Sequence, residues 1–181
     1  MLKEISVNQN ILEMMLFYWE SVASKDKMSD EYFLELAGKK EMQGLYSDEF
    51  TKDSFRRVLS AISNREKLNS QSMKESKFWN QNMRMIEDLT LTNAMIAPVK
   101  KLNLSELVGE DLKTEKLEVL FIPLPEGDFF ASKEAIVFNF FSILASYNGE
   151  DFEVISDIKV SLHGKDVKEY VVETIKAQYK E

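Results

Sequence analysis

The stretch KLEVLFIPLPEG, residues 116–127, decides the fold class of this chain. From Leu117 to Ile122 it is almost wholly apolar, and two prolines and a glycine close it. A short apolar run ended by turn-forming residues is typical of a buried strand followed by a turn. The stretch KEAIVFNFFSIL, residues 133–144, starts with β-branched and aromatic residues and predicts a second strand over residues 135–141.

The chain before these strands predicts helices. Apolar residues recur at three- and four-residue spacing between Ile11 and Val22, which predicts a helix there. Ser29 is a good N-cap for the next helix, and Gly38 fits its end. The same signals return at Thr51, which should cap a helix with a buried stripe made of Phe55, Val58, Leu59 and Ile62.

Two more helices are expected before the strands. One carries large apolar residues from Phe78 to Leu89, and Thr92 is expected to cap the following one. Pro98 falls inside that helix and should kink it or start a new one, because proline lacks the N–H that a helix interior needs.

In the last third of the chain, the predicted secondary structure changes from one short segment to the next. Asn148 and Gly149 form a turn pair. Residues 152–162 fit a strand and a helix equally well, since their apolar positions satisfy both periods. Residues 165–179 predict an amphipathic C-terminal helix.

These patterns predict an α+β fold, mainly α, in which a helical N-terminal half packs with a small sheet in the C-terminal half. We expect a single domain over residues 1–181. Its helical part covers residues 1–110, and its strand-containing part covers residues 111–181 and ends in a helix. No flexible linker marks the change in composition near residue 110.

Charge and composition exclude several classes of protein. The net charge is −8, whereas nucleic-acid binding needs a basic face, and an anionic membrane would repel the chain. There is no cysteine, so disulfides, thiolate zinc sites and iron–sulfur clusters are excluded. The apolar runs Met14–Trp19 and Ala135–Tyr147 are too short or too polar for a signal peptide or a membrane helix. We therefore expect a cytoplasmic protein without nucleic-acid or membrane partners.

The sequence lacks most of the motifs that mark catalytic sites. His163 is the only histidine, no Gly-x-Ser-x-Gly elbow exists, and no glycine-rich phosphate loop is present. Arg56 and Arg57 are adjacent on a helix and point apart, which favours a solvated face over an anion site. The densest group of acidic residues consists of Glu150, Asp151, Glu153 and Asp157. We interpret this group as a solvated turn followed by the start of a helix.

Residues 102–144, LNLSELVGEDLKTEKLEVLFIPLPEGDFFASKEAIVFNFFSIL, together with the helical residues 32–62, resemble the N-terminal part of putative zinc-dependent peptidases of the HExxH, gluzincin-like type. In that family a strand like VLFIPL, a small-residue turn and a strand like IVFNF precede the helix that bears HExxH. The resemblance extends to about residue 162. It implies a scaffold that holds peptides along a sheet edge.

The metal motif of that family is absent from this chain. If residues 162–167, LHGKDV, occupy its position, His163 stands in place of the first ligand, Gly164 replaces the general-base glutamate and Val167 replaces the second histidine. The resemblance leaves Glu173 as the candidate distal carboxylate. Because zinc peptidases need both histidines and the glutamate, we expect no metal, no cofactor and no catalytic residue. A capping, turn or surface role is expected for His163, and Gly164 directly after it favours a helix stop or a turn.

Three functions fit these observations. The first is a non-catalytic, degenerate or truncated relative of the zinc-peptidase scaffold that binds a peptide or protein. The second is a small acidic interaction protein of the inhibitor or immunity type, which covers a basic partner without enzymatic activity. The third is a zinc-dependent peptidase whose catalytic helix is missing from this chain.

Overall fold

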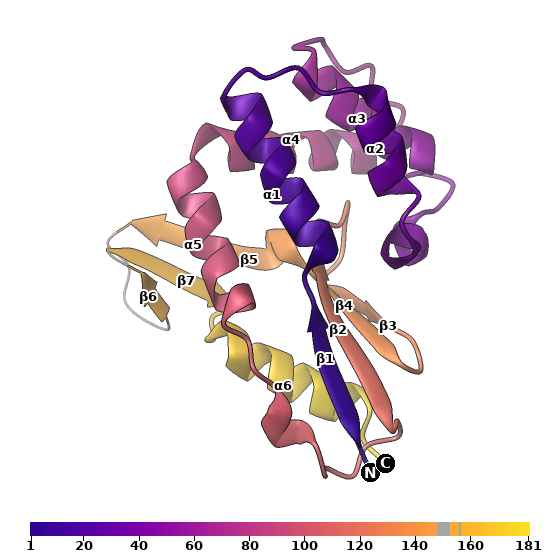
Figure 1. Ribbon diagram of the computed structural model, residues 1–181, viewed down its shortest axis with the longest axis vertical. Coiled ribbons are helices and arrows are strands. Elements are labelled where there is room, and N and C mark those ends of the chain that lie inside the picture. Colours follow the sequence, from indigo (N-terminus) through magenta and orange to yellow (C-terminus); the bar gives the residue numbers. More distant parts are fainter. Residues whose placement is uncertain (148–152, 156) are drawn as a thin grey trace. The chain divides into compact units, whose positions relative to one another are not determined.

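The computed structural model describes residues 1–147, 153–155 and 157–181 (Figure 1). It is an α+β fold with a helical majority, as the sequence predicts. The helices are α1 (Asn10–Ala23), α2 (Asp30–Ala37), α3 (Lys52–Ser63), α4 (Met73–Glu87), α5 (Leu89–Lys100) and α6 (Val167–Gln178), with short 3-10 helices at Lys40–Leu45, Ser105–Leu107 and Phe140–Ser142. The strands are β1 (Glu4–Asn8), β2 (Lys116–Ile122), β3 (Phe129–Ala131), β4 (Ala135–Asn139), β5 (Ile143–Tyr147), β6 (Glu153–Ile155) and β7 (Ile158–Leu162).

The chain forms two compact units. The first comprises Met1–Gln9, Thr90–Ile122 and Gly127–Glu181, and the second comprises Asn10–Leu89 and Pro123–Glu126. In the described part of the chain, none of the helices has the length and apolar character that a membrane crossing requires.

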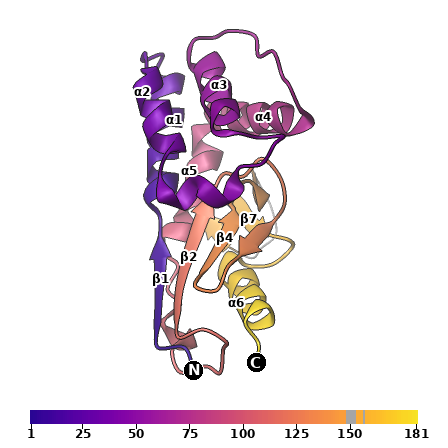
Figure 2. The same ribbon diagram turned by 90° about the vertical axis from the view of Figure 1, so that its right-hand side faces the viewer.

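The first unit is built on a four-stranded sheet in the order β1-β2-β4-β3. β1, β2 and β4 are parallel, and β3 is an antiparallel edge strand. α6 runs along one face of this sheet (Figure 2), where Tyr170 contacts Phe138 with ring centroids 6.2 Å apart. β2 is almost wholly buried after its first residue, in agreement with the apolar run that predicts it.

The strand β1 was not expected, because the sequence before β2 predicts helices only. Its five residues pair in parallel with β2, from Glu4 beside Lys116 to Asn8 beside Leu120. The partner strand lies more than a hundred residues later in the chain, so no turn or local period marks the pairing. Parallel pairing of this kind depends on tertiary contacts rather than on local sequence.

The predicted strand at residues 135–141 ends earlier than expected. β4 stops at Asn139, whose side-chain Oδ1 accepts a hydrogen bond from the N–H of Phe141 at 2.9 Å. This bond begins the 3-10 turn at Phe140–Ser142 that leads the chain into β5.

A second sheet of three antiparallel strands, in the order β5-β7-β6, settles the open assignment of residues 152–162: Glu153–Ile155 and Ile158–Leu162 are strands, and Asp157 lies in a turn. Glu153 therefore lies in a strand and not at a helix start. The Asn148–Gly149 turn pair, and Glu150 and Asp151 of the acidic group, lie outside the described residues.

The second unit is a set of helices around an aromatic core. Phe78 of α4 lies between Phe50 and Phe55, with ring centroids 5.0 and 5.6 Å away. Trp19 of α1 donates its indole N–H to Asn82 Oδ1 of α4 at 2.9 Å, and both side chains are fully buried. The predicted stripe of α3 is buried as well: Phe55, Val58, Leu59 and Ile62.

The start of α5 differs from the sequence prediction. α5 begins at Leu89, and Thr92 is buried inside it rather than capping it. Asp88, with φ −142° and ψ 89°, is the non-helical residue that separates α4 from α5. The helix then continues through Pro98 to Lys100, so the proline does not start a new helix.

Candidate functional site

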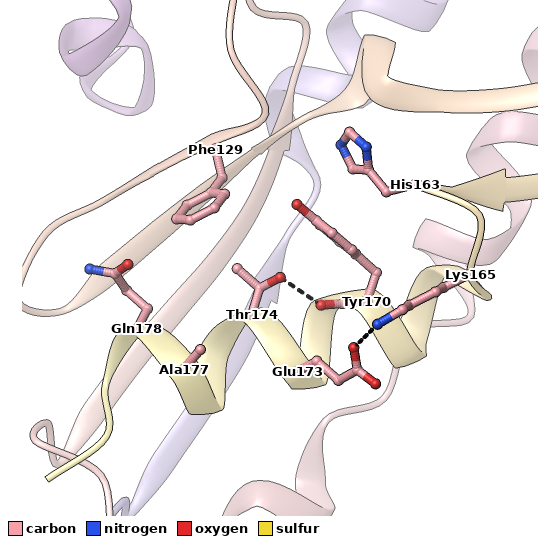
Figure 3. A pocket seen from close by; sticks show the side chains of 8 residues that line it. All are labelled: Phe129, His163, Lys165, Tyr170, Glu173, Thr174, Ala177 and Gln178. Atoms are coloured by element: carbon pink, nitrogen blue, oxygen red, sulfur yellow. Dashed lines mark hydrogen bonds and ion pairs between the residues drawn. The ribbon is translucent and has the colours of Figure 1, made fainter.

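An open cleft of about 460 Å³ lies on the first unit between the edge strand β3 and α6. Its lining comes from three elements (Figure 3): one ring from β3, two side chains from the turn after β7, and one face of α6. The lining residues are Phe129, His163, Lys165, Tyr170, Glu173, Thr174, Ala177 and Gln178.

The helix α6 presents a continuous face to the cleft. Its first turn is capped by Asp166, whose Oδ2 accepts a hydrogen bond from the Glu169 N–H at 3.2 Å. Val167, Val171 and Ile175 are buried against the rest of the unit, so the helix is fixed by its apolar stripe. The cleft residues on α6 occupy the neighbouring face, because they recur at the three- and four-residue spacing of a helix: Tyr170, Glu173, Thr174, Ala177 and Gln178.

The end of α6 is tied to the β3–β4 turn. Tyr179 Oη lies 2.8 Å from the carbonyl oxygen of Ser132 and 2.9 Å from that of Ala135, so its one hydrogen is shared between them. Burial raises the pKa of Tyr179 to about 12, which keeps this donor protonated across the neutral range. These hydrogen bonds hold the C-terminal end of α6 against the β3–β4 turn.

His163 lies in the turn between β7 and α6, as expected for a turn residue. It has φ +49° and is followed by Gly164 with φ +76°. This left-handed pair turns the imidazole toward β3, where Nε2 lies 3.0 Å from Asp128 Oδ1. The imidazole also contacts Tyr170, with ring centroids 4.9 Å apart. His163 thus connects the turn to the loop before β3.

Tyr170 supplies the main polar group inside the cleft. Figure 3 shows its hydroxyl pointing into the space between Phe129 and His163. Burial raises the pKa of Tyr170 above its ordinary value, and the negative charge of Asp128 adds to the increase. The hydroxyl stays protonated at neutral pH and can donate a hydrogen bond to a ligand.

Lys165 and Glu173 are oppositely charged residues in the lining of the cleft. Lys165 forms an ion pair with Glu173 across the first turns of α6, and this pair raises the pKa of Lys165. The imidazole Nε2 of His163 lies 3.0 Å from Asp128 Oδ1. The lining also includes the ring of Phe129, which is 36% exposed, and the methyl group of Ala177. The centre of the cleft suits an uncharged side chain.

The outer edge of β3 carries main-chain groups that no strand in the described part of the chain covers, because β3 is the last strand in the order of its sheet. The N–H of Asn139 donates to Asp128 O, and the N–H of Ser132 donates to Ala135 O, both at 2.8 Å. Antiparallel pairing alternates along a strand. The main-chain N–H and C=O groups of Phe129 and Ala131 therefore point away from β4 and toward the open edge.

The residues that the zinc-peptidase resemblance singles out lie partly together. His163 and Glu173 both line the cleft, whereas Gly164 forms the turn and Val167 is the buried first residue of α6. Within the described ranges, no three His, Asp or Glu side chains gather in a way that could hold a metal ion. Gly164 and Val167 carry no group that can bind zinc or accept a proton.

Arg56 and Arg57 of the second unit have acidic partners in the structure. Arg56 pairs with Asp53 at 2.9 Å and with Asp30 at 3.4 Å. Arg57 pairs with Asp53 at 2.9 Å and with Glu75 at 2.7 Å. The two arginines thus hold neighbouring segments of the chain together.

Two lining residues, Phe129 and Tyr170, carry no functional signal in the sequence, and neither does Asp128, which contacts His163. Asp128 and Phe129 belong to a turn and a three-residue strand, and Tyr170 is one apolar position of an amphipathic helix. The contacts that bring them together arise only in the folded sheet.

No protein-family model, no curated protein and no solved structure matches this chain.

Proposed function

We propose that this protein is a non-catalytic peptide-binding relative of the zinc-peptidase scaffold, and that it binds an extended peptide along β3. The observation that carries the proposal is the open edge of β3 beside the α6 cleft. The main-chain groups of Phe129 and Ala131 offer hydrogen bonds to an added strand, which is a common way in which domains bind peptides.

In this proposal the peptide lies beside β3. An added strand would run about 4.8 Å beyond β3, and every second side chain would point to the α6 side of the sheet. Phe129 and Phe138 are paired across the two strands and share that side, since Phe138 contacts Tyr170. A peptide side chain on that side enters the cleft.

The lining of the cleft supports one kind of peptide side chain. An apolar or aromatic side chain would contact Phe129 and Ala177, and a polar atom at its end would meet the Tyr170 hydroxyl. A charged side chain is disfavoured, because Lys165 and Glu173 already balance each other's charge.

The test is the affinity of a fluorescein-labelled peptide in which phenylalanine alternates with threonine, measured by fluorescence anisotropy. Ala131→Pro removes one outward N–H while leaving the bonds to β4, and we expect it to weaken binding about tenfold. Ala131→Val keeps this N–H and is the matched control, with affinity expected to stay within about twofold.

Two results would contradict the proposal. If the wild-type protein does not bind the peptide, or if both Ala131 variants bind as well as the wild type, strand addition at β3 is wrong. Mass spectrometry of the peptide after incubation with and without added Zn²⁺ should show an intact peptide. A cleaved peptide would overturn the non-catalytic part of the proposal and leave the binding part standing.

A further inference from the structure

The second unit has a cleft of its own, of about 530 Å³, on the outer face of α1 next to α2. It shares no residue with the cleft at β3. It is lined by Asn10, Glu13, Met14, Phe17, Tyr32 and Lys39.

Two aromatic rings form the wall of this cleft. Phe17 and Tyr32 have ring centroids 5.8 Å apart at an interplanar angle of 51°. Phe17 is 58% exposed, although α1 buries a wide apolar face elsewhere. Tyr32 is held in place, because its hydroxyl donates to the carbonyl oxygen of Met14 at 2.8 Å. An ordered aromatic pair that is open to solvent is typical of a binding surface.

Carboxylates surround the pair. Glu13 precedes Phe17 by one helical turn and Glu20 follows it by one turn, so all three share one exposed face of α1. On α2, Glu35 lies close enough that its charge, together with burial, raises the pKa of Tyr32.

Lys39 is the cation that lines this cleft. Its Nζ lies 3.6 Å from Glu35 Oε1, so its charge is balanced within the protein. Glu13 and Glu20 have no ion-pair partner among the described residues, so the negative charge of Glu13 in the lining stays unbalanced, whereas Lys39 is paired with Glu35.

From this arrangement we propose that the α1–α2 cleft binds an arginine side chain of a basic partner segment. The planar guanidinium would lie against the Phe17 and Tyr32 rings and face Glu13. Guanidinium groups combine stacking on aromatic faces with hydrogen bonds to carboxylates, which lysine does less well. The charge of the site, and the net charge of −8 of the chain, select a basic partner over an acidic one.

The experiment uses the full chain and an acetylated, amidated hexapeptide in which arginine alternates with leucine. Isothermal titration calorimetry measures its affinity beside that of the same peptide with citrulline in place of arginine, which keeps the shape and removes the charge. We expect the arginine peptide to bind at least about threefold more tightly, and Phe17→Ala and Glu13→Gln each to weaken it about threefold.

Glu87→Gln is the matched control, because Glu87 is an exposed glutamate on α4 and its loss changes the net charge equally. It should leave the affinity unchanged. Lys39→Ala removes the cation that balances Glu35 and should strengthen binding of the arginine peptide.

Several outcomes would overturn the proposal. Equal affinity for the arginine and citrulline peptides would show that charge does not select the partner. Equal effects of Glu13→Gln and Glu87→Gln would show unspecific attraction to an acidic chain. Self-association that Phe17→Ala abolishes, measured by analytical ultracentrifugation, would assign the cleft to a second copy of the chain instead.

Discussion

Glu75 is a carboxylate in the interior of the second unit, with a side chain that is only 2% exposed. Ser54 Oγ and Arg57 Nη2 donate to its Oε2 at 2.8 and 2.7 Å, and the Gln71 N–H donates to its Oε1 at 3.1 Å. Burial by itself would raise the pKa of Glu75, but these hydrogen bonds and the charge of Arg57 hold the pKa below its ordinary value.

Because the pKa of Glu75 is lowered by folding, the direction in which the stability changes with pH follows. The stability that Glu75 contributes is fully present above the pKa of the unfolded chain, which is about 4.3 for glutamate. It is lost as the pH falls through the lower pKa of the folded protein.

Glu75→Gln should therefore lower the free energy of unfolding by about 1.5–3 kcal/mol at pH 7, because it weakens charged hydrogen bonds. The difference from the wild type should shrink as the pH falls below about 4. Urea unfolding at both pH values measures it, with the exposed Glu87→Gln as control. A difference that does not change with pH would contradict the assigned role of the charge.

At the scale of elements, two helices of the second unit begin with the same kind of signal and are capped differently. Thr51 accepts a hydrogen bond from the Ser54 N–H at 3.1 Å, and Ser54 Oγ accepts one from the Thr51 N–H at 3.0 Å. This capping box satisfies two donors at the start of α3. Ser29 occupies the N-cap position of α2, but its side chain makes no capping hydrogen bond.

Thr51→Ala should therefore lower the free energy of unfolding by about 1 kcal/mol. Ser29→Ala should lower it by clearly less, since no capping bond is lost. Chemical denaturation of the two variants under one set of conditions gives the comparison. Equal losses would mean that Ser29 caps α2 in solution.

At the scale of the whole molecule, the two proposed sites belong to different units. The β3 site uses residues of the first unit, and the α1–α2 site uses residues of the second. Sites that share no partner and no network are expected to act independently.

A double variant with Ala131→Pro and Glu13→Gln tests this independence. Its affinity for the phenylalanine–threonine peptide should equal that of Ala131→Pro alone, and its affinity for the arginine peptide should equal that of Glu13→Gln alone. We expect agreement within about 0.5 kcal/mol in binding free energy. A larger departure in calorimetry would show that the two sites are coupled.

Local signals in the sequence were sufficient where neighbouring residues decide the structure. The apolar run before Pro123 predicted β2, the stripe from Phe55 to Ile62 predicted the buried face of α3, and the amphipathic period of residues 165–179 predicted α6. The glycine after His163 predicted the turn that the left-handed φ angles confirm. Each of these features depends on a period or a cap within a few residues.

Contacts between residues far apart in the sequence decided the features of the fold that the local signals did not predict. β1 exists because β2 offers it a parallel partner, and Thr92 is buried because α5 starts at Leu89 instead of at the expected cap. The open edge at Phe129 and Ala131 follows from the strand order, and the cleft follows from the position of α6 against that edge.

The sequence by itself determined the α+β class, the buried strand β2 and most helices, because hydrophobic periodicity and capping are local properties. Only the tertiary structure decided which side chains meet. Asp128, Phe129, His163 and Tyr170 come from three separate elements, and no spacing along the chain encodes their contact. The physical reason is that burial acts on whole faces of elements, while a site depends on the register in which those faces pack.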